Sequence, residues 1–116
     1  MNSTTFDQVV LDRLDKCAKT LSVKADEYAT GDRLHNFKIA AAIQGCTPLT
    51  ALAGMMAKHT VSVYDLIQRY EFGQPVSKEM WDEKIGDSIN YLLLLTALIE
   101  EDRESHTQMC EESDEE

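Results

Sequence analysis

The sequence has little proline and little glycine, with two and five of these residues in a chain of 116. Because both residues interrupt regular structure, their scarcity leaves room for long helices. Apolar and polar residues do not alternate in the way that a half-buried strand requires. The sequence therefore predicts an all-α fold, and its length suffices for one domain with one modest core.

Cysteine is also sparse, and the three cysteines are Cys17, Cys46 and Cys110. Their number is odd and no two form a C-x-x-C pair, so neither a disulfide framework nor a zinc site is indicated. The sequence also lacks a signal-peptide core and an apolar run of membrane length. We therefore expect a cytoplasmic protein that has no contact with a membrane.

Basic charge is scarce, and the formal net charge is −10. Most of the excess lies in residues 100–116, where nine acidic residues face Arg103 alone, whereas the other 99 residues carry 12 acidic and 10 basic side chains. Without a basic patch, direct nucleic-acid binding is not expected. The composition predicts one helical domain at 1–103 and a disordered acidic tail at 104–116.

Four stretches have apolar residues at helical spacing, at about 5–28, 33–44, 47–70 and 77–101. Asp32 is a suitable N-cap for the second stretch, which ends before Gly45. Thr47 followed by Pro48 marks the start of the third, and Ser77 caps the fourth. These signals predict a four-helix bundle-like arrangement.

The first and fourth stretches differ in how much apolar surface they carry. The predicted core stripe of the first is Phe6, Val10, Leu14, Cys17 and Leu21, and its opposite face, which includes Lys16 and Lys19, should be solvated. The fourth stretch is apolar on most of its sides, which predicts burial on most of its sides. Three other helices do not suffice to cover it, so we expect a homo-oligomer, either a dimer or a tetramer.

Acidic residues head an apolar stripe of the fourth stretch, where Glu83, Asp87 and Asn90 stand at i, i+4 and i+7. An unpaired buried carboxylate is costly, so these residues need a partner. Glu27 and Asp32, near the corner between the first two stretches, would complete an oxygen-rich cluster. Mg²⁺, or Mn²⁺ in its place, prefers carboxylates, waters and phosphate oxygens, so the acidic residues are candidate metal ligands.

Arg33, Lys38 and Lys58 are candidates to bind the phosphates that accompany such a cation. A metal-activated water that attacks phosphorus would then make the site a hydrolase. Plainer interpretations stay open, because Asp32 can be an N-cap only and Glu83 lies near a helix start that favours negative charge. His59, on the apolar stripe of the third stretch, is more typical of a core histidine than of a ligand.

Three short segments within residues 10–100 carry a resemblance to a known family. They are Lys24-x-x-Glu27-Tyr28 with Asp32-Arg33-x-x-Asn36-Phe37-Lys38, Met55-Met56-Ala57-Lys58-His59 with Asp65, and Asp82-Glu83-Lys84-Ile85-Gly86-Asp87-Ser88-Ile89-Asn90-Tyr91. Together they resemble the MazG-like, all-α nucleoside triphosphate pyrophosphohydrolases, which are often phage-encoded. The resemblance implies a helical, oligomeric protein that binds Mg²⁺ and cleaves a (deoxy)nucleoside triphosphate into a monophosphate and pyrophosphate.

The resemblance also implies roles for individual residues. Glu27, Glu83 and Asp87 would be catalytic metal ligands, with Asp32 as a fourth. Lys58 would contact phosphate, and Asn36 or Asn90 would orient substrate or water.

The sequence departs from the family pattern, which has E-x-x-E on an early helix and E-x-x-D on a later one. Here Asp26-Glu27 and Glu83-x-x-x-Asp87 stand in those places. The departure leaves open a protein that binds or sequesters a nucleotide without turnover, such as a phage counter-defence sponge. A third hypothesis is a small helical interaction protein whose acidic tail engages a basic partner.

Overall fold

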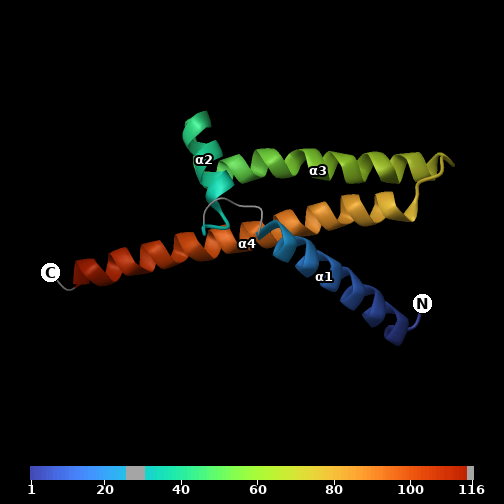
Figure 1. Ribbon diagram of the computed structural model, residues 1–116, viewed down its shortest axis with the longest axis horizontal. Coiled ribbons are helices and arrows are strands. Elements are labelled where there is room, and N and C mark those ends of the chain that lie inside the picture. Colours follow the sequence, from blue (N-terminus) through green and yellow to red (C-terminus); the bar gives the residue numbers. More distant parts are fainter. Residues whose placement is uncertain (26–30, 115–116) are drawn as a thin grey trace.

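The computed structural model of the chain describes residues 1–25 and 31–114, with side chains for 1–24 and 31–107. Throughout these ranges the regular structure is helical, which confirms the all-α prediction, and the helices are α1 (Ser3–Ala25), α2 (His35–Gln44), α3 (Pro48–Glu71) and α4 (Lys78–Asp114). In Figure 1, α3 and α4 run side by side, α2 lies across one end of α3, and α1 meets the middle of α4.

The ends of α2, α3 and α4 follow the capping signals in the sequence. Gly45 ends α2 in the left-handed region, at φ 68°. The Thr47 hydroxyl accepts a hydrogen bond from the Thr50 amide at 3.2 Å, and Pro48 occupies the first turn of α3. Ser77 does the same for α4, because its hydroxyl accepts from the Met80 amide at 3.1 Å.

The core lies where α2 packs onto the pair formed by α3 and α4. Its most buried members are Leu34 and Phe37 from the start of α2, Leu52 from α3 and Leu98 from α4. At the other end of the pair, the Tyr70 and Trp81 rings meet edge to face at 5.9 Å. Large side chains therefore hold α3 and α4 together at two separate places along the pair.

α1 reaches the rest of the chain through its second half. Arg13 donates hydrogen bonds to the Asp82 side chain and, at 3.1 Å, to the Asp82 backbone oxygen, and Lys16 adds a third at 3.2 Å. Cys17 is buried between the two helices. Burial raises the pKa of the Cys17 thiol, with Arg13 opposing this shift.

The predicted core stripe of α1 is wrong over its first half. Phe6, Val10 and Leu14 are exposed, Phe6 by 57 %, whereas Cys17 is buried and Leu21 half-buried. The physical reason is the angle at which α1 meets α4, since its N-terminal turns lie away from the other helices (Figure 1).

α4 extends further than the sequence signals indicate. The composition predicts a disordered tail from residue 104, but the helix continues to Asp114. After Gly86 the sequence has neither glycine nor proline to end a helix, and His106 contacts the Asp102 carboxylate one turn earlier. Leu92, Leu93 and Ile99 remain exposed, so this chain alone does not bury α4 on most of its sides.

Taken singly, the helices of residues 1–25 and 31–114 include none that is long and apolar enough to span a membrane. α2 and α3 reach that length and composition only together, with a bend of 100° at the break between them.

Acid should weaken the docking of α1. Hydrogen bonds from Arg13 and then Lys16 hold the pKa of Asp82 below its ordinary value of 3.8. A carboxyl whose pKa is lower in the folded state stabilises that state above its ordinary pKa, and the effect is lost as pH falls through the folded-state value. We expect Asp82→Asn to lower stability at neutral pH and to flatten the acid limb of a stability-versus-pH curve.

Asp15→Asn is the matched control, because Asp15 pairs with Lys19 at 2.9 Å within α1 itself and on its exposed side. Hydrogen exchange of the α1 amides gives a second readout, with faster exchange in Asp82→Asn only. Equal losses in the two variants would contradict the assignment.

Candidate functional site

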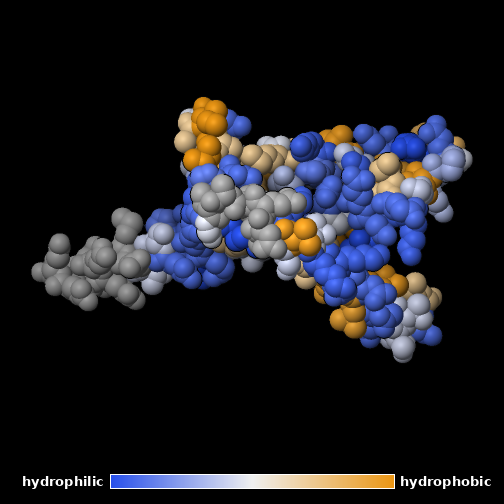
Figure 2. Space-filling model, in the orientation of Figure 1, coloured by the Kyte–Doolittle hydropathy of each residue, from blue (hydrophilic) through white to orange (hydrophobic). Residues whose placement is uncertain are grey.

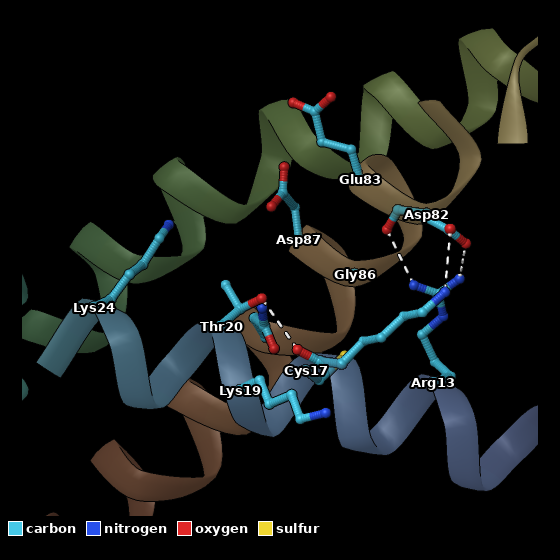
Figure 3. Close-up of a pocket in the computed structure, with 11 residues that line it drawn as sticks. Arg13, Cys17, Lys19, Thr20, Lys24, Asp82, Glu83, Gly86 and Asp87 are labelled. Atoms are coloured by element: carbon cyan, nitrogen blue, oxygen red, sulfur yellow. Dashed lines mark hydrogen bonds and ion pairs between the residues drawn. The ribbon is translucent and has the colours of Figure 1, made fainter. Parts of the chain in front are cut away.

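A cavity of about 500 Å³ opens between α1 and α4 (Figure 3). Residues at i, i+3, i+4 and i+7 on the facing sides of the two helices line it. They are Arg13, Lys16, Cys17, Lys19, Thr20 and Lys24 from α1, with Asp82, Glu83, Gly86, Asp87 and Asn90 from α4.

The two walls carry opposite charge. On α1, Arg13 and Lys16 bind Asp82, and Lys19 binds Asp15, a contact that raises the pKa of the Lys19 ammonium. Lys24 has no ion-pair partner among the side chains that the structure describes. The basic wall therefore keeps Lys24 as the cation most available to a ligand.

Two carboxylates of α4 stand apart from that ion pair. In Figure 3, Glu83 and Asp87 project to the same side of α4, whereas Asp82 turns toward Arg13. Lys24 points to the same side as the two carboxylates. Glu83 is exposed and Asp87 half-buried, so both can reach a ligand in the cavity.

His59 of α3 lies next to Asp87. Its Nδ1 atom lies 3.6 Å from Asp87 Oδ2, an ion-pair distance that exceeds a hydrogen bond. The His59 ring also packs on Tyr91, with ring centroids 4.6 Å apart. The histidine thus contacts one of the candidate ligands, which its place on an apolar stripe did not indicate.

A second cavity, of about 100 Å³, adjoins the first and shares Lys24, Asp87 and Asn90 with it. Its other lining residues are Leu21, Arg33, Asn36, Phe37, Met55, Tyr91 and Leu94. The Arg33 guanidinium donates to the Leu21 carbonyl at 2.7 Å, which holds the segment before α2 against α1.

Asn90 lies where the two cavities meet. It is 8 % exposed, and its Oδ1 atom has no hydrogen-bond partner within the described part of the chain. A buried acceptor without a partner is costly, so such an atom needs an explanation.

The structure brings together five of the residues predicted from the sequence. Glu83, Asp87 and Asn90 line the larger cavity, and Arg33 and Asn36 line the smaller one beside it. Glu27 lies outside the described residues.

Three other predicted site residues lie elsewhere. Asp32 accepts from the Leu34 amide at 2.9 Å and from Lys38 at 2.6 Å, which lowers the pKa of its carboxyl, with Lys38 as the larger cause. Lys38 also binds Glu101 at 2.7 Å, and both carboxylates raise its pKa. These contacts tie α2 to α4, as the plainer interpretation of Asp32 expects. Lys58 is exposed on α3 and lines neither cavity.

The sequence interpretation missed the lysines of α1. Lys16 and Lys19 belong to a face that was expected to be only solvated, yet both line the larger cavity. Lys24 could have been found, because it follows Cys17 by seven residues and Leu21 by three and so shares their side of the helix.

The donor atoms of the site are compatible with Mg²⁺. Among the side chains of 1–24 and 31–107, no three from His, Cys, Asp and Glu lie close enough together to hold a metal ion. Mg²⁺ usually binds through one or two carboxylates and completes its shell with waters and substrate phosphates. Glu83 and Asp87, one turn apart on the same cavity, supply that number of carboxylates.

No family model, curated protein or solved structure matches the chain. The function is therefore argued from the residues and geometry of the two cavities.

Loss of Lys24 should weaken phosphate binding. A hydrogen bond to a charged group contributes about 1.5 kcal/mol or more, so Lys24→Ala should bind inorganic tripolyphosphate roughly tenfold more weakly in the presence of Mg²⁺. Calorimetric titration measures this. Lys58→Ala is the control, since Lys58 lines neither cavity; equal losses in the two variants would place the phosphate site elsewhere.

Proposed function

We propose that this chain is a cytoplasmic, Mg²⁺-dependent nucleotide pyrophosphohydrolase that converts a (deoxy)nucleoside triphosphate to a monophosphate and pyrophosphate. One observation carries the proposal: a cavity with Glu83 and Asp87 on one wall and Lys24 on the other opens into a smaller cavity lined by Phe37 and Tyr91. A metal-bound polyphosphate fits the first, and a ring attached to it fits the second.

Glu83 and Asp87 would hold the metal ion, which supplies Lewis-acid activation of a phosphoryl oxygen and of a water. Glu83 is exposed and lines the cavity, and its carboxylate oxygen that does not hold the metal would accept the proton of the attacking water. Water adds to one phosphorus of the α–β anhydride, and the bridging oxygen leaves on the other. Lys24 would neutralise the negative charge that develops on the leaving phosphate. His59, whose Nδ1 atom lies 3.6 Å from Asp87 Oδ2, would help to orient that carboxylate.

A nucleotide-binding protein without turnover is the second candidate. It is favoured by the small number of carboxylates. Among the side chains of 1–24 and 31–107, Glu83 and Asp87 are the only carboxylates of the larger cavity that are not paired with a cation of α1. The binding residues would be the same, so the fate of the ligand decides between the two candidates.

Turnover should be visible as pyrophosphate release. We expect the full chain with Mg²⁺ to release pyrophosphate from at least one member of a panel of ribo- and deoxynucleoside triphosphates. Asp87→Asn should lower kcat by roughly 100-fold or more, by analogy with the loss of other groups that stabilise charge in a transition state. Asp65→Asn, outside both cavities, is the control.

A ligand that raises the melting temperature and is recovered intact would support binding without turnover. No release from any nucleotide, together with no Mg²⁺ binding by calorimetry, would exclude the hydrolase.

We also propose that the protein is a homo-oligomer. Figure 2 shows apolar side chains on the free part of α1 and on the end of α2. Phe6, Leu14, Leu92 and Leu93 are exposed in the single chain. Large apolar side chains exposed in this number are typical of proteins that bury them against a second chain.

A charge placed in that surface should shift the oligomeric state. Leu92 is 52 % exposed, and Leu92→Glu should lower the mass measured by light scattering toward the 13.1 kDa of one chain. Val61→Glu is the matched control, because Val61 on α3 is 57 % exposed. A wild-type protein that is monomeric at micromolar concentration would contradict the proposal.

A further inference from the structure

The smaller cavity has a character of its own. It is lined by the apolar and aromatic side chains of Leu21, Phe37, Met55, Tyr91 and Leu94, with the polar side chains of Arg33 and Asn36 beside them. It adjoins the larger cavity, with which it shares Lys24, Asp87 and Asn90. If the phosphates of a ligand lie beside Lys24, the group attached to them can therefore enter the smaller cavity.

We propose that the smaller cavity is a nucleobase subsite for a single ring, so that the ligand of this protein is a pyrimidine nucleotide. The inference rests on the proposed function in one respect, namely that the ligand carries phosphates. It does not require that these phosphates are hydrolysed.

The size of the cavity favours one ring over two. An apolar cavity of about 150 Å³ is known to hold benzene. The smaller cavity is smaller still, at about 100 Å³, so it has room for one six-membered ring at most. The second ring of a purine adds volume that a cavity of about 100 Å³ does not supply.

The aromatic wall is held in place by neighbouring rings. Phe37 and Tyr91 meet edge to face, with centroids 6.3 Å apart and planes at 76°. The other side of Tyr91 packs on His59, at 33° between the planes. A ring fixed by two neighbours cannot easily turn aside, so the aromatic wall of the cavity keeps its position.

Asn90 supplies the polar recognition. Its amide is nine-tenths buried, and the Oδ1 atom has no partner in residues 1–25 and 31–107. A carboxamide pairs at once with a neighbouring donor and acceptor, and both uracil and cytosine present such a pair on one edge. Asn36, exposed at the mouth of the same cavity, can bind a second edge or the sugar.

Binding of uncleavable analogues tests the inference without hydrolysis. The probes are α,β-imido triphosphates of uridine, cytidine, adenosine and guanosine, titrated into the full chain with Mg²⁺. We expect one pyrimidine analogue at least to bind roughly tenfold or more tightly than either purine analogue, which is the discrimination expected of a pocket that fits one ring. Equal or tighter binding of the purine analogues would overturn the inference.

Two variants locate the discrimination. Met55→Ala enlarges the cavity and should narrow the preference for pyrimidine, whereas Met56→Ala, which packs on the core without lining the cavity, should leave it unchanged. Asn90→Asp keeps the size of the side chain and should weaken binding of the pyrimidine analogue more than binding of inorganic tripolyphosphate. Equal weakening of both probes would show that Asn90 does not recognise the nucleobase. The Asn90→Asp variant serves as the test if Met55→Ala does not fold.

The outcomes separate this inference from the hydrolase proposal. A preference for pyrimidine analogues without release of pyrophosphate would support the nucleobase subsite and contradict the hydrolase proposal. Equal hydrolysis of purine and pyrimidine nucleotides would support the hydrolase proposal and contradict the pyrimidine subsite.

Discussion

The ion pair between Arg13 and Asp82 is the contact on which the candidate site depends. Within residues 1–25 and 31–114, α1 packs against α4 and has no comparable contact with α2 or α3. The ion pair lies at the point where α1 and α4 begin to diverge (Figure 1). With α1 detached, the larger cavity would lose its basic wall and the smaller cavity would lose Leu21 and Lys24. The α3–α4 pair does not depend on it in the same way, because the core cluster of Leu34, Phe37, Leu52 and Leu98 contains no residue of α1.

The same contact divides the acidic residues of α4 into two groups. Asp82 and Glu83 are adjacent in sequence, but about 100° of helix rotation separates their side chains. Asp82 therefore meets Arg13 and Lys16, while Glu83 joins Asp87 one turn later on the open side of the cavity. Because α1 neutralises Asp82, the repulsion that remains at the cavity comes from Glu83 and Asp87, which a cation can offset.

Local signals in the sequence were enough to predict most of the helices and part of the site. Thr47-Pro48, Ser77 and Gly45 act within a few residues of the backbone that they cap, so their effect does not depend on the rest of the fold. The stripe of Glu83, Asp87 and Asn90 was likewise predictable, because helical periodicity alone places these residues on one face. The exposure of Phe6 was not, since it depends on the crossing angle between α1 and α4, which no local pattern encodes. Lys38 is a second feature that local sequence does not predict. Its charge is suitable for binding a phosphate, but the tertiary structure shows that Asp32 and Glu101 bind it instead.

The features that local rules leave unsatisfied gather at one place in this molecule. Two like charges, Glu83 and Asp87, line one cavity, Lys24 faces them without a described partner, and the buried Oδ1 atom of Asn90 lies where that cavity meets the next. The buried Asn90 acceptor costs stability in the free chain, and proteins tend to break local rules where they bind or react. A metal-bound phosphate that carries a ring would satisfy all of them together, since it brings a cation, an anion and a hydrogen-bonding edge in the order in which the cavities present their partners. That agreement in order, more than any single residue, is what favours a nucleotide over a simple anion or an apolar ligand.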